Sequence, residues 1–218
     1  MDRRQFGRAT SLGLLSLVMA GGSVLSLLEG CAAVPTATFI QMGLQLLGTV
    51  IPTIPGIISA FAALVGKTLS VSQVTKLTSI FQGVGDLFSR ANAALQQFQA
   101  NNDTSLISQI EDLLGQIKTN LAGVLTDVQI SDQATLVKIT SIVNSFIDLA
   151  NNLLSILPVV SGGKLIARKV PKARMAQVTA SGWATRFNRA VQTSSGNSEI
   201  DSAFAGVSAK VPTTYGSH

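Results

Sequence analysis

Residues 71–98 read VSQVTKLTSIFQGVGDLFSRANAALQQF, and this stretch decides the fold class. Its apolar residues recur at steps of three and four, which places them on one face of a helix. They are Val71, Val74, Leu77, Ile80, Phe81, Val84, Leu87, Phe88, Ala91, Leu95 and Phe98. Just before them, Ser70 and Gln73 have the spacing of a capping box. The stretch therefore predicts one long amphipathic helix.

Two more segments with the same periodicity follow, over residues 106–128 and 136–154. Capping residues precede both segments: Asp103 or Thr104, and Ser131 or Asp132. Pro158 ends the second of them. The connections are short and polar, which favours antiparallel neighbours. We therefore predict an all-α fold, an antiparallel up-down bundle of three long helices.

The segment before these helices, residues 32–66, contains no charged residue. Pro52 and Pro55 divide it, and a proline inside a helix removes a hydrogen bond and clashes with the preceding turn. We predict a short helix, a tight break and a second short helix, packed on the bundle as a fourth element. Buried core is the plain interpretation of this segment. The alternative is that residues 38–66 insert into a membrane or join a pore.

The character of the chain changes after Pro158. Ser161, Gly162 and Gly163 are typical of a flexible linker, and short helices are expected near residues 183–191 and 200–207. We divide the mature chain into a helical bundle domain, 31–158, and a basic, mostly irregular linker and tail, 159–218.

Charge is unevenly distributed between these parts. Residues 31–163 hold five Lys/Arg against seven Asp/Glu, a net charge of −2, whereas residues 164–218 hold eight against two, a net charge of +6. The basic stretch consists of Lys164, Arg168, Lys169, Lys172 and Arg174. Such a stretch is either a solvated connector or a contact for anionic lipid or an anionic envelope polymer. We do not expect a nucleic acid partner for this stretch.

The N-terminus has the parts of an export signal. Three arginines within the first eight residues precede an uncharged run, residues 9–28, and small residues surround Cys31. A basic region, an apolar region and a cleavage point with small residues make up a signal peptide. The charge stays on the cytoplasmic side while the apolar run enters the bilayer.

Two motifs in this region resemble those of bacterial lipoproteins exported by the twin-arginine route. Arg3, Arg4 and Phe6 resemble the twin-arginine motif, and residues 28–31 (LEGC) are similar to a lipobox. The resemblance covers only the signal region; it implies a signal peptide over residues 1–30 and a lipid on Cys31 that holds the chain on a membrane. Two alternatives stay open: an ordinary cleavage site at residues 31–33, and an uncleaved anchor formed by residues 9–28.

The residues that commonly carry catalysis or bind metals are scarce. The single histidine is the terminal residue, His218, and the single cysteine is Cys31, which argues against Ser-His or Cys-His catalysis and against zinc sites. Residues 101–105 begin like a calcium loop but lack the turn glycine. Residues 161–164 match Ser-x-x-Lys, although two glycines disfavour the helix that this motif needs. We therefore expect a protein that is not an enzyme and has no cofactor or metal.

These observations predict a membrane-anchored helical bundle of the bacterial cell envelope, with a structural or interaction role and a protein partner that the sequence does not identify. One alternative is the membrane-inserting or pore-associated protein described above. Another is a carrier that opens its Leu/Ile-rich bundle around a lipid or another apolar ligand.

Overall fold

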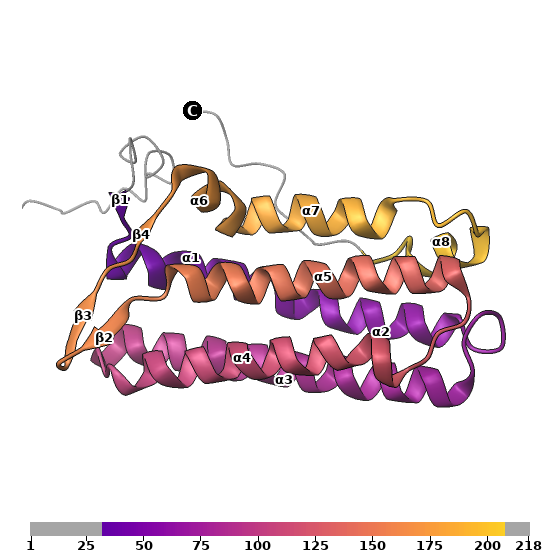
Figure 1. Cartoon of the computed structure of the whole chain (residues 1–218), viewed down its shortest axis with the longest axis horizontal. Coiled ribbons are helices and arrows are strands. Elements are labelled where there is room, and N and C mark those ends of the chain that lie inside the picture. Colours follow the sequence, from indigo (N-terminus) through magenta and orange to yellow (C-terminus); the bar gives the residue numbers. More distant parts are fainter. Residues whose placement is uncertain (1–31, 208–218) are drawn as a thin grey trace, which may run out of the picture.

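The computed structural model describes residues 32–207, and it is a helical bundle with a few short strands at one end (Figure 1). The helices are α1 (Thr36–Val50), α2 (Ile54–Ala63), α3 (Val71–Asn101), α4 (Ser105–Asp127), α5 (Gln133–Ile156), α6 (Lys172–Val178), α7 (Ala180–Gln192) and α8 (Ser198–Phe204). The strands are β1 (Ala32–Ala33), β2 (Val159–Ser161), β3 (Lys164–Ile166) and β4 (Lys169–Val170). The prediction of an all-α bundle with three long helices is confirmed.

The three long helices α3, α4 and α5 pack in sequence order, α3 on α4 and α4 on α5. Figure 1 shows the two connections between them at opposite ends of the bundle. The predicted capping box is present, because the Ser70 hydroxyl accepts from the Gln73 amide and the Gln73 side chain accepts from the Ser70 amide. Asp132 caps α5 through a 2.7 Å hydrogen bond from the Thr135 amide.

The proline-split segment forms α1, a 3-10 turn over Ile51–Thr53, and α2. Pro52 and Pro55 stand in the first turns of the 3-10 helix and of α2. Amide groups in a first turn have no partner within their own helix, so the missing N–H groups cost little there. The two predicted helices are present, and in place of a sharp break the 3-10 turn joins them with the backbone still in the right-handed helical region.

This uncharged segment supplies a large part of the core. Helix α1 packs against α3 and α7, and α2 packs against α3 and α8. Phe39, Leu46, Val50, Ile57 and Phe61 are each no more than 2% exposed. By length and composition alone, residues Thr36–Ala63 would suffice to cross a membrane, a criterion that core helices of soluble proteins also meet. The burial of its large side chains supports the core interpretation.

The predicted linker and mostly irregular tail are wrong for residues 159–207. Ser161–Gly163 is not a linker, because β2 pairs with β3 in an antiparallel hairpin in which Ser161 faces Lys164. Gly162 and Gly163 make its turn at φ values of 56° and 72°, a left-handed conformation that glycine adopts without steric cost. The periodicity of residues 183–191 and 200–207 correctly indicated α7 and α8.

The tail helices complete the hydrophobic core. Trp183 of α7 stacks on Phe187 at a ring distance of 4.8 Å, and both rings meet Phe146 of α5 edge-on at 5.6 Å. The Trp183 indole N–H donates to the backbone oxygen of Ser145 at 3.1 Å. Residues from α1 to α8 thus form one continuous core cluster.

One glycine allows α1 and α3 to approach closely. A Cβ atom on Gly43 would lie 2.6 Å from Leu95 Cδ2. We expect Gly43→Val to lower the free energy of unfolding by about 1–3 kcal/mol, because the larger side chain must displace the buried Leu95 side chain. Gly48→Ala is the matched control on the same helix, because nothing lies within 4 Å of that position. It should raise the free energy of unfolding by about 0.5–1 kcal/mol, and urea titration of both variants measures the two effects.

Candidate functional site

The strands at one end of the bundle bring the start of the described chain beside the basic stretch. Strand β1 pairs antiparallel with β4, so that Ala32 faces Val170 and Ala33 faces Lys169. The Val34 amide extends the pairing with a 3.2 Å hydrogen bond to the Arg168 carbonyl. Ala32, the residue that follows the position expected to carry the lipid, therefore lies beside β4.

The basic residues are distributed over the elements at this end. Lys164 lies in β3, Lys169 in β4, and Lys172 and Arg174 in α6, and all four are exposed to solvent. Arg168 lies between β3 and β4 and is half-buried, and its Nε is one of the few buried nitrogen or oxygen atoms in the described chain without a hydrogen-bond partner. The chain contains no Asp or Glu between Asp148 and Glu199. This segment therefore carries positive charge with no acidic residue among its neighbours in the sequence.

The remaining predicted site residues, Arg3, Arg4, Phe6 and Cys31, lie outside the described residues, 32–207. The export motif and the lipid on Cys31 stay predictions.

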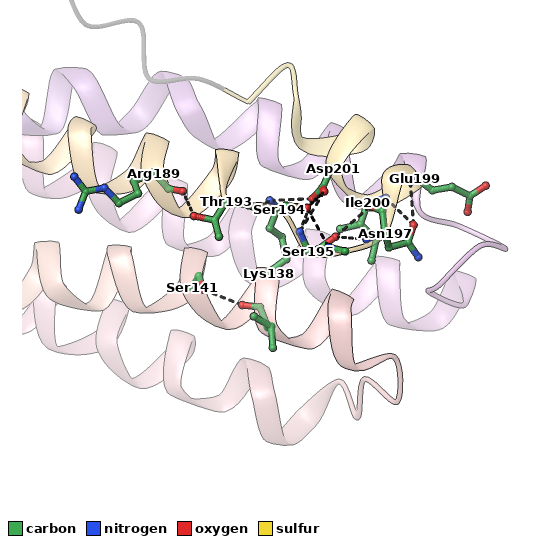
Figure 2. A network of polar contacts seen from close by, with 12 residues as sticks. Lys138, Ser141, Arg189, Thr193, Ser194, Ser195, Asn197, Glu199, Ile200 and Asp201 are labelled. Atoms are coloured by element: carbon green, nitrogen blue, oxygen red, sulfur yellow. Dashed lines mark hydrogen bonds and ion pairs between the residues drawn. The ribbon is translucent and has the colours of Figure 1, made fainter.

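A second polar site, absent from the sequence-based predictions, lies at the other end of α7 (Figure 2). Lys138 of α5 is only 3% exposed, and its Nζ lies 3.3 Å from Asp201 Oδ1 of α8. The same ammonium group donates to the Thr193 carbonyl. Asp201 also accepts from the Ser195 amide at 2.9 Å and from the Ser194 hydroxyl at 2.9 Å. We call Lys138, Asp201, Thr193, Ser194 and Ser195 the Lys138–Asp201 tie.

The hydrogen bonds of the tie set the charge of Asp201. The bond from the Ser195 amide, helped by the Ser194 hydroxyl and by Lys138 and opposed by partial burial, lowers the pKa of Asp201 from 3.8 to about 2. Its carboxylate is therefore ionised at neutral pH and balances the buried ammonium group. Asn197 caps α8 nearby, with its side-chain oxygen accepting from the Glu199 amide at 2.9 Å.

The geometry of the tie is that of a structural contact. In a Ser-Lys pair that acts on a substrate, the lysine must take the proton of the serine hydroxyl. Here the Ser194 hydroxyl donates to Asp201, and the Lys138 ammonium group is engaged by a carboxylate and a carbonyl oxygen. The contact fixes the α7–α8 connection onto α5.

The helical periodicity of the sequence indicated that Lys138 lies on the buried face of α5. Lys138 stands four residues before Ile142, in line with the buried face of α5 formed by Ile139, Ile142 and Phe146. A lysine at a core-facing helical position requires a partner, because an isolated buried charge is costly. The partner, 63 positions later in the chain at Asp201, is not indicated by any local pattern.

A polar depression of about 460 Å³ lies where α5, α6 and α7 meet. It is lined by Asp148, Asn151, Asn152, Arg174, Gln177 and Arg186. Arg186 donates to the Gln177 carbonyl at 2.8 Å, which joins α6 to α7. The guanidinium, amide and carboxylate groups that line this depression are suited to hydrogen bonding with polar groups.

Within residues 32–207, no group of three or more His, Cys, Asp or Glu side chains is placed to hold a metal ion. No protein-family model, curated protein or solved structure matches this chain. The functional argument therefore depends on the sequence motifs and on the geometry described above.

Proposed function

We propose that this protein is a bacterial lipoprotein, exported by the twin-arginine route and held on a membrane of the cell envelope by acyl chains on Cys31. Its bundle then serves a structural or interaction role outside the cytoplasm. The observation that carries the proposal is the pairing of β1 with β4, which joins the position after Cys31 to the basic stretch. Acyl chains contribute about 0.8 kcal/mol per buried CH₂, and each Lys or Arg near an anionic surface contributes about 1 kcal/mol.

The acyl chains on Cys31 and the basic stretch reinforce each other as membrane contacts only if they lie at the same end of the bundle. Stable membrane attachment by acylation combines one chain with a second chain or with a polybasic patch. Strand pairing meets this condition, because the residue next to Cys31 is fixed against the strand that contains Lys169. A basic stretch at the far end of the bundle would instead face away from the membrane. The bundle supplies the exported body, with its apolar residues used in one core.

Export is tested by a substitution that keeps the charge. We expect Arg3→Lys combined with Arg4→Lys to hold the precursor inside the cell, because lysine cannot reproduce the planar donor array of arginine. Arg8→Lys is the matched control; it makes the same chemical change outside the motif and should leave export unchanged. Immunoblots of envelope and cytoplasmic fractions measure the distribution of the three proteins.

The outcomes separate the parts of the proposal. Normal export of the double variant would contradict twin-arginine routing while leaving export itself standing. Wild-type protein in the soluble cytoplasmic fraction would contradict the whole proposal. Equal retention of the double variant and of Arg8→Lys would show that arginine side chains in this region generally, and not the paired motif, are required for export.

A further inference from the structure

The β2–β3 hairpin lies at the end of the bundle where β1 begins (Figure 1). It exposes apolar side chains. In the described chain six large hydrophobic residues are exposed, and three of them, Val159, Val160 and Ile166, belong to this hairpin. Ile166 is 53% exposed and Val159 is 40% exposed. Half of the exposed large apolar residues thus belong to one short structure.

The register of the hairpin gathers apolar and basic groups on one face. Val159 faces Ile166 across the strands, and Ser161 faces Lys164. Alternate residues of a strand lie on the same face, so Val159, Ile166 and Lys164 share one face of the hairpin. Leu165 lies on the opposite face and packs against the hydrophobic core. The face that contains Leu165 also contains Val160, which is 37% exposed. The other face consists of the apolar pair Val159 and Ile166 and the polar pair Ser161 and Lys164.

This combination matches the chemistry of a membrane interface. Apolar side chains enter the boundary between headgroups and acyl chains, while a neighbouring lysine keeps its ammonium group among the phosphates. The basic residues that follow the hairpin lie in β4 and α6, with no acidic residue between Asp148 and Glu199. Positive charge of this kind attracts the anionic headgroups of a bilayer.

We propose that the outer face of the β2–β3 hairpin inserts into the headgroup region of the bilayer to which Cys31 is anchored. This inference rests on the proposed function for the anchor. Val159 and Ile166 enter the interface, and Lys164, Lys169 and Lys172 contact anionic headgroups. The bundle is thereby oriented on the membrane by two contacts, the acylated N-terminus and the hairpin.

The test places a fluorescent reporter on the hairpin. Ile166→Cys protein is extracted from membranes, labelled with an environment-sensitive maleimide dye and reconstituted into vesicles of phosphatidylglycerol and phosphatidylcholine that contain nitroxide-labelled lipid. Val71→Cys is the matched control, because Val71 is 68% exposed and begins α3, at the end of the bundle away from the hairpin in Figure 1. Fluorescence of the single tryptophan, Trp183, checks before labelling that each variant is folded.

The expected result is a blue-shifted dye at position 166 that the nitroxide quenches several-fold more strongly than the dye at position 71. Replacing Lys164, Lys169 and Lys172 by glutamine, or using phosphatidylcholine alone, should reduce the quenching. Equal quenching at both positions would overturn the inference. A blue shift that persists in detergent without nitroxide quenching would also overturn it, and would indicate that a second copy of the chain covers the hairpin.

A separate control distinguishes failure of lipidation at Cys31 from failure of hairpin insertion. An acylated Cys31 cannot react with maleimide, so wild-type protein should take no label. If wild-type protein is labelled at Cys31, lipidation fails, and the measurement at position 166 is repeated in a Cys31→Ser background. Quenching at position 166 there would still support hairpin insertion, and its absence would overturn it.

Discussion

Trp183→Ala is expected to lower the free energy of unfolding by about 3–5 kcal/mol, the range for removing a large buried aromatic side chain. Trp183 is 1% exposed. Its ring contacts Phe187 and Phe146, and its N–H donates to Ser145. The substitution leaves a cavity between α5 and α7 and removes the indole hydrogen bond to the Ser145 carbonyl. Urea titration followed by circular dichroism measures the loss.

A smaller change at the same position serves as the control. Trp183→Phe keeps an aromatic ring and loses the hydrogen bond, so we expect a cost of about 1–2 kcal/mol. A loss below about 1 kcal/mol for Trp183→Ala would contradict the account of the tail helices, since that result is expected only if α7 were peripheral to the core. Two separate unfolding transitions in the wild-type protein would contradict it as well.

Asp201→Asn is expected to cost about 2–3 kcal/mol, because it leaves the buried ammonium group of Lys138 without a counter-charge. The estimate is at the low end for buried ion pairs, since the Asp201 side chain is 32% exposed. Glu199→Gln is the matched control, because Glu199 lies 3.7 Å from Lys67 in a pair whose side chains are 54% and 48% exposed. An exposed pair of this kind contributes less than about 1 kcal/mol.

A double variant separates the buried charge from the loss of hydrogen bonds. Lys138→Met combined with Asp201→Asn removes both charges, so it should be more stable than Asp201→Asn alone. The opposite order, with the double variant less stable than the single one, would contradict the assignment of Lys138 as a buried charge that needs Asp201.

The Lys138–Asp201 pair makes the free energy of unfolding depend on pH under acidic conditions. The pKa of Asp201 is lowered in the folded state from 3.8 to about 2. Its contribution to stability is therefore fully present above about pH 4, and is lost as the pH falls through about 2. The difference in unfolding free energy between wild type and Asp201→Asn should shrink by about 1–2 kcal/mol across this window. A difference in unfolding free energy that does not change with pH would contradict the claim that the ionised carboxylate of Asp201 stabilises the fold.

Local patterns predicted the long helices well because each carries its own signals. The three- and four-residue spacing of α3, the capping box at Ser70 and the Asp132 cap are all encoded within a few residues. The two helices of the proline-split segment were predicted equally well, because Pro52 and Pro55 favour the first turns of helices. These features depend on interactions between neighbours in the sequence.

Features that depend on distant partners were not predicted. Gly162 and Gly163 fit a flexible linker as well as a hairpin turn, and only the pairing of β2 with β3 distinguishes the two. The pairing of Ala32 with Val170 joins residues that are far apart in the sequence, and no local pattern indicates it. The basic stretch was recognised from composition, but its position beside the N-terminal strand came from the fold.

The most direct test of the account is mass spectrometry of the N-terminal peptide of the protein isolated from envelope membranes. The account predicts a chain that begins at Cys31, with fatty acyl groups attached to that residue. A chain from the soluble intracellular fraction that still begins at Met1 or Asp2, with an unmodified thiol on Cys31, would contradict it.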